Sequence, residues 1–105
     1  MPNGESKNWI RFCAAIDGFR GRYCRWPLFI KVPTFFIDEL QNVLPEKDFL
    51  KISSMITLIG DDSGFAFVAE DESGNQYNYE KEGFSNERPD NRAIDWLGVK
   101  PDYYD

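Results

Sequence analysis

The chain has 105 residues, of which 42% are hydrophobic and 29% charged, and its formal net charge is −6. This is the composition of one globular domain, and it excludes a disordered chain, which combines low hydrophobicity with high net charge. The apolar runs, such as residues 55–59, are far shorter than the ~20 residues that span a bilayer. Residues 1–9 are polar and do not resemble a signal peptide, so we expect a soluble, cytoplasmic protein.

The first half of the chain predicts three helices and one strand. Apolar residues recur every three or four positions from Trp9 onward, which indicates an amphipathic helix, and the same pattern returns twice further along. The expected elements are a helix that Ser6 caps and that Gly18 and Gly21 end, a loop over 20–26, a strand over 28–32, a helix that Pro33 and Thr34 introduce, and a short helix from Pro45 to about Ser53.

The second half predicts three strands and a last helix. Short links with Asp and Gly separate the strand-like segments, and such links are typical of antiparallel hairpins. We therefore expect a three-strand meander whose last strand lies at an edge. The expected elements are strands over 55–60, 65–69 and 76–80, and a helix over 91–97 that Asp90 caps and Gly98 ends.

Together these elements predict a single α+β domain over residues 1–105, with flexible termini at 1–6 and 101–105. Its order is α-β-α-α-β-β-β-α, with a small, mainly antiparallel sheet and helices on one face of it. We expect the inward positions of helices and strands to be mostly buried, namely Phe12, Ile16, Ile37, Leu40, Val43, Ile56, Leu58, Phe67 and Leu97.

Residues suited to catalysis or metal binding are few. The chain has two cysteines and no histidine, which removes the commonest general base and every Ser-His-Asp or Cys-His arrangement. Two thiols do not complete a zinc site, so no catalytic residue, metal or cofactor is predicted. Cys13 belongs to the apolar stripe of the first helix and Cys24 to the following loop, and both are expected to stay unpaired; Cys24 would be reactive if exposed.

Carboxylates gather in the links between the predicted strands, at residues 61–62 and 70–72. Such a group could act as a general acid and base or bind a divalent cation. However, Asp, Ser, Asn and Gly in these links are also what tight turns require. Residues 71–82 faintly resemble a calcium loop, but Gln76 stands where its glycine should be. We interpret both links as turns.

The candidate binding segment is the basic and aromatic stretch over 20–26. Residues 1–32 carry six basic and two acidic side chains, whereas residues 33–105 carry six basic and sixteen acidic ones. Guanidinium and aromatic groups can hold a phosphate, stack on a base or pair with carboxylates. We expect Arg22 and Arg25 to pair with carboxylates of residues 33–105. The candidate site residues are Arg20, Arg22, Tyr23, Arg25 and Trp26.

The leading hypothesis from the sequence is a small acidic module that binds a protein partner, or a second copy of itself, without catalysis. Aromatic residues near element ends would supply such a contact: Trp26, Phe35, Phe84, Trp96, Tyr103 and Tyr104. One alternative is a ligand-binding domain or enzyme that uses Arg22, Arg25, Asp38 and Glu39. Another is nucleic-acid binding through residues 20–26, which the net negative charge disfavours.

Overall fold

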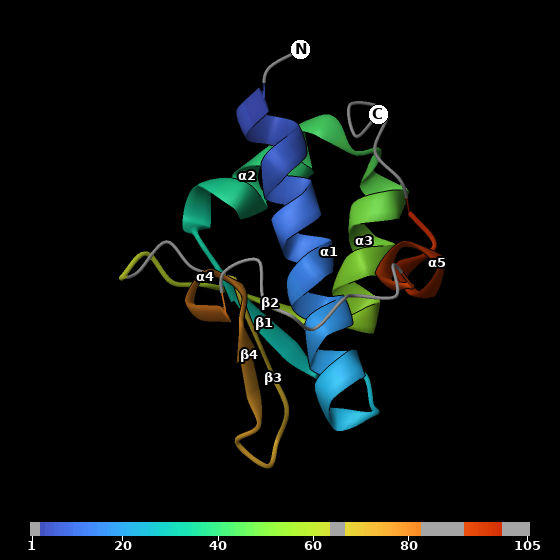
Figure 1. Cartoon of the computed structure of the whole chain (residues 1–105). Helices are drawn as coiled ribbons and strands as arrows, with labels where there is room; N and C mark the ends of the chain where they lie inside the picture. The colour runs from blue at the N-terminus through green and yellow to red at the C-terminus, as the bar shows by residue number, and fades with distance from the viewer. Residues whose placement is uncertain (1–2, 64–66, 83–91, 100–105) are drawn as a thin grey trace.

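The computed structural model describes residues 3–63, 67–82 and 92–99 (Figure 1). The fold is α+β, and the expected order of elements is confirmed, with one additional turn of helix, α4, after the last strand. The elements are α1 (Asn3–Tyr23), β1 (Phe29–Val32), α2 (Thr34–Val43), α3 (Glu46–Met55), β2 (Thr57–Gly60), β3 (Val68–Glu70), β4 (Gln76–Asn78), α4 (Tyr79–Glu82) and α5 (Ala93–Leu97).

Helix α1 is longer than the sequence predicts at both ends. It begins at Asn3 rather than near Ser6, and it continues through Gly18 and Gly21, which were expected to end it. Gly18 serves a packing role instead, because a Cβ built on it would overlap the ring of Tyr77 in β4. The helix ends where Cys24 adopts a left-handed conformation, with φ of 60°, a position that glycine more often takes.

The sheet is mixed: two of its three described strand pairs are antiparallel, as expected, but β2 does not pair with β3 as the predicted meander requires. Its strand order is β2-β1-β3-β4, so β1 lies between β2 and β3. β1 pairs parallel with β2 and antiparallel with β3, and β3 pairs antiparallel with β4. The segment from β1 through α2 and α3 to β2 is therefore a crossover between parallel strands, which needs a dozen or more residues. The prediction that β4 lies at an edge is confirmed.

The two faces of the sheet differ in character. Paired residues share a face, and Ile30, Ala69 and Tyr77, which pair in one row, are all buried. The helices pack on this inner face, with α1 crossing in front of the sheet (Figure 1). The outer face is partly exposed, and there the Lys31 Nζ lies 3.0 Å from the Glu70 Oε2.

The core confirms most of the expected buried positions. Phe12, Ile16, Leu40, Ile56, Phe67 and Leu97 are buried. Ile37 and Leu58 are half-buried. Val43 is 42% exposed and is the one clear miss among them. It is the last residue of α2, and the next residue, Leu44, is buried in its place.

Two helices receive their N-terminal caps from residues distant in the sequence. Asp17, buried in α1, accepts hydrogen bonds from the backbone amides of Arg92 and Ala93 at the start of α5, at 3.0 and 2.7 Å. Asp62 accepts the backbone amide of Thr34 at 2.8 Å and its hydroxyl at 2.9 Å, at the start of α2. Such bonds satisfy amides that a helix leaves unpaired. The expected cap residue Asp90 lies outside the described residues, as do Phe84, Tyr103 and Tyr104.

Gly98 ends α5 as expected, in a left-handed conformation with φ of 74°. Its amide bonds to the carbonyl oxygen of Ile94, and Val99 beyond it is buried. Within the part of the chain that the structure describes, no helix is both long enough and apolar enough to cross a membrane.

Candidate functional site

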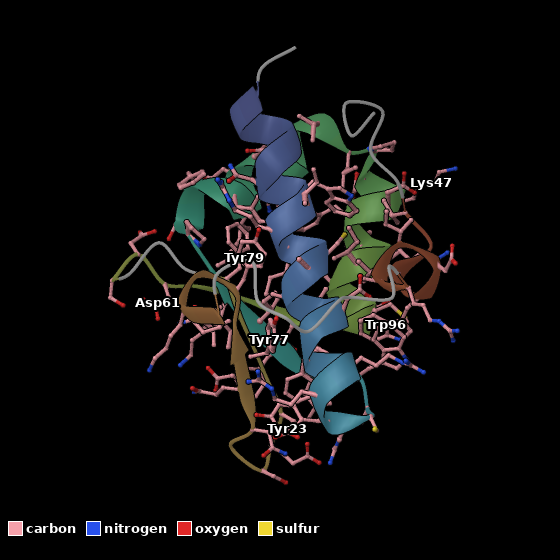
Figure 2. All side chains as sticks on the ribbon, viewed as in Figure 1. Tyr23, Lys47, Asp61, Tyr77, Tyr79 and Trp96 are labelled. Atoms are coloured by element: carbon pink, nitrogen blue, oxygen red, sulfur yellow. The ribbon has the colours of Figure 1, made fainter. Side chains whose placement is uncertain are left out.

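The candidate binding segment is not a loop throughout. Arg20, Arg22 and Tyr23 belong to the last turn of α1, and only Cys24, Arg25 and Trp26 lie in the connection to β1. The expected loop over 20–26 is therefore wrong for its first half, since the helix continues past Gly21. Figure 2 shows Tyr23 and Tyr77 along the lower half of α1 on the side of β4, with Trp96 on its other side.

On the β4 side, the segment is tied to the turn between β3 and β4. The Arg25 guanidinium lies 3.2 Å from the Glu72 Oε1 and 3.7 Å from the Asp71 Oδ2. The Tyr23 hydroxyl donates to the Gln76 carbonyl oxygen at 2.9 Å. The prediction that Arg25 pairs with later carboxylates is confirmed. With the Arg25 side chain 46% exposed, the pair contributes about 0–1 kcal/mol.

Aromatic stacking holds the other side of the segment. The rings of Trp26 and Trp96 are parallel to within 1°, with centroids 4.4 Å apart. The Arg20 guanidinium carbon lies 5.0 Å from the ring centroid of Trp26, and that of Arg22 lies 4.9 Å from the ring of Tyr77. Both distances suit cation–π attraction.

Arg22, Tyr23, Arg25 and Trp26 thus contact distant parts of the same chain, and Arg20 packs on Trp26 within the segment. Trp26 connects the end of α1 to α5, and Tyr23, Arg22 and Arg25 connect it to β4 and the turn before it. This arrangement supports the structural reading of the basic segment, in which it folds against the acidic part of its own chain. It gives no added support to nucleic-acid binding.

The Asp71 carboxylate stabilises the turn of the β3–β4 hairpin, as interpreted from the sequence. The other link follows β2, which does not pair with β3, so it is not a hairpin turn, and its Asp62 caps α2. The Asp71 Oδ1 accepts the amides of Ser73 and Asn75, at 2.9 and 3.0 Å. The Asp61 Oδ1 accepts the amide and the hydroxyl of Ser63, at 3.0 and 2.7 Å. The described residues contain no group of three or more His, Cys, Asp or Glu side chains placed to hold a metal ion.

These hydrogen bonds affect both carboxyl groups. The side-chain and backbone bonds from Ser63 lower the pKa of Asp61. Burial raises the pKa of Asp71, but the bonds from Asn75 and Ser73 outweigh it, so the pKa lies below its ordinary value. Both groups are therefore held as anions that accept local hydrogen bonds, which is the opposite of what a general acid needs.

The two thiols are unpaired, as expected, and they lie in different surroundings. Cys13 is buried in α1, and burial together with the nearby charge of Asp17 raises its pKa well above the ordinary value. Cys24 is exposed at the end of α1. Because the thiolate is the reactive form, Cys13 is an inert core residue.

The alternative Arg and carboxylate site is not assembled. Arg25 is paired at the turn between β3 and β4, whereas Asp38 and Glu39 belong to α2. Helix α2 packs through Phe36 on Phe12, halfway along α1, with ring centroids 5.3 Å apart. In Figure 1, α2 lies toward the opposite end of the molecule from the last turn of α1.

A hollow between α2 and α3 was not predicted from the sequence. It is an open depression of about 380 Å³, lined by Gln41, Glu46, Phe49 and Leu50. The Leu50 side chain is 57% exposed, and Phe49 is half-buried against the core. Residues 34–55, which form the two helices, carry four acidic and two basic side chains. The lining of the hollow thus combines two apolar side chains, Phe49 and Leu50, with the carboxylate of Glu46 and the amide of Gln41.

No protein-family model matches this sequence, and comparisons with curated proteins and with solved structures also find no match. The functional argument therefore rests on the residues of this chain alone.

Proposed function

We propose that the protein is a non-catalytic interaction module that binds a protein partner through the hollow between α2 and α3. The observation that carries the proposal is the exposed Leu50 beside Phe49 in an open depression that Glu46 also lines. An apolar centre with a polar border is the usual anatomy of a protein–protein contact. The partner segment has an apolar side chain flanked by Lys or Arg, because it must complement both parts of this surface.

Two further features support binding rather than catalysis. The hollow is open, and its four lining residues include one titratable group, Glu46. An enzyme site more often encloses its substrate and brings several polar groups together. The arginines of residues 20–26, the other source of functional groups, contact their own chain. The net charge of −6 adds a long-range attraction for a basic partner.

The test is affinity capture from an extract of the native host with three forms of the protein. Leu50→Lys places a positive charge in the hollow. Because Leu50 is exposed, the substitution should leave folding unaffected. Ile10→Lys is the matched control, because Ile10 is 44% exposed on α1. We expect the unmodified chain and Ile10→Lys to retain a partner that Leu50→Lys does not retain. Salt should release this partner.

Equal retention by Leu50→Lys would contradict the proposed surface. Turnover of a substrate by the purified protein would contradict the absence of catalysis.

A further inference from the structure

The outer edge of β2 has the character of a pairing surface. The two edge strands of the described sheet are β2 and β4. β4 has three residues and continues directly into α4, so little of its edge is available. β2 has four residues, Thr57–Gly60, with no charge and no proline. Natural sheets usually protect an edge with charged residues, proline or a bulge, and β2 has neither of the first two.

The backbone groups of β2 alternate between the neighbouring strand and the open edge. The amide of Thr57 donates to the carbonyl oxygen of Leu28 at 3.0 Å, and that of Asp61 donates to Val32 at 2.8 Å. The backbone N–H and C=O groups of residues 57, 59 and 61 therefore point toward β1, and those of Leu58 and Gly60 point outward. No described strand pairs with them.

We propose that two copies of the chain pair their β2 strands antiparallel and join their four-stranded sheets into one. In the register that uses every outward group, Leu58 lies opposite Gly60 of the second copy, and Gly60 lies opposite Leu58 of the second copy. Each such pair exchanges two backbone hydrogen bonds. The two-fold axis then passes between the two copies of Ile59.

The side chains of this register complement one another. Ile59 is half-buried on the outer face and would contact its own copy across the axis, where side chains of a non-hydrogen-bonded pair come closest. Exposed Thr57 would lie opposite Asp61 of the second copy, as a hydroxyl donor facing a carboxylate. Among the described residues the Asp61 bonds end on Oδ1, which leaves Oδ2 to accept. Like charges do not meet, since the two Asp61 side chains lie at opposite ends of the contact.

A second copy of the chain fits this edge better than an unrelated strand does. In the two-fold register the outward N–H and C=O groups of Leu58 and Gly60 bond to the same groups of the second copy. The inference is independent of the hollow between α2 and α3, and failure of one proposal does not affect the other. Sedimentation of the purified full chain tests the proposed dimer and requires no partner other than the chain itself.

We expect a concentration-dependent species of twice the chain mass of 12.2 kDa. Ile59→Glu should weaken this dimer by at least about tenfold, since it places two carboxylates directly opposite each other. Within one copy the new carboxylate lies beside Lys31, its neighbour in β1, so circular dichroism should show an intact fold. Ile10→Glu, at an exposed position of α1, should dimerise normally. A monomer at about 1 mM unmodified protein, or an equally strong dimer of Ile59→Glu, overturns the proposal.

Disulfide cross-linking tests the register itself. In a Cys24→Ser background, Ile59→Cys should form a linked dimer on oxidation, because facing Cα atoms of such a pair lie ~4.5 Å apart, within disulfide range. Thr57→Cys should not, because its two copies would lie ~13 Å apart along the strands. Equal or preferred cross-linking through Thr57→Cys overturns the proposed pairing.

Discussion

Replacement of Gly18 by alanine tests how closely α1 packs on the sheet. In an exposed helix interior this substitution stabilises by about 1 kcal/mol, since alanine is the better helix former. At Gly18, however, the added methyl group would lie 2.8 Å from the Tyr77 Cδ1 and closer still to other ring atoms. Tyr77 is 3% exposed and held within the core. Overpacking of this kind costs about 1–3 kcal/mol, which exceeds the helical gain when the ring cannot move.

Gly21 provides the matched control within the same helix. A Cβ on Gly21 meets nothing within 4 Å, so Gly21→Ala should raise the free energy of unfolding by up to about 1 kcal/mol. Gly18→Ala should lower it by about 1–2 kcal/mol. Urea unfolding followed by circular dichroism measures both. Equal stabilisation by the two substitutions would refute the close contact between α1 and β4.

Three further predictions follow from buried and hydrogen-bonded groups. Asp17→Ala removes the acceptor at the start of α5 and should cost about 1–3 kcal/mol of stability; a change below about 0.5 kcal/mol in urea unfolding would contradict this role. Cys24 should react with a thiol reagent in the folded protein, and Cys13 should react only after unfolding. Mass spectrometry of labelled peptides measures both, and labelling of Cys13 before Cys24 would contradict the prediction. The pKa of Asp71 is lowered from 3.8 in the folded state, so its contribution to stability is present above that value and is lost as the pH falls below it. Asp71→Asn should therefore make the stability less dependent on pH in this acidic range. An unchanged pH dependence would contradict the lowered pKa of Asp71.

Local sequence patterns predicted the elements and their order well, because hydrophobic periodicity and turn residues act over short distances. The turn at Asp71 is an example, since its hydrogen bonds reach only to Ser73 and Asn75. The pairing of Arg25 with later carboxylates was also predictable, from the opposite charges of the two parts of the chain.

Features that depend on contacts between distant segments were not predictable in this way. β2 was expected to pair with β3, the next strand, but it pairs with β1, which only the crossover through α2 and α3 brings alongside. The close packing that requires a glycine at position 18 involves Tyr77, which lies far along the chain. The hollow at Leu50 likewise arises from how α2 and α3 meet, and an exposed leucine in a helix gives no warning of it.

The most direct test of the proposed function is a hydrogen-exchange footprint of the captured complex. The amides of residues 41–50, which carry the lining of the hollow, should exchange more slowly with the partner bound, and those of residues 20–26 should be unchanged. Slower exchange at residues 20–26 with no change at 41–50 would contradict the account and place the partner on the basic segment instead.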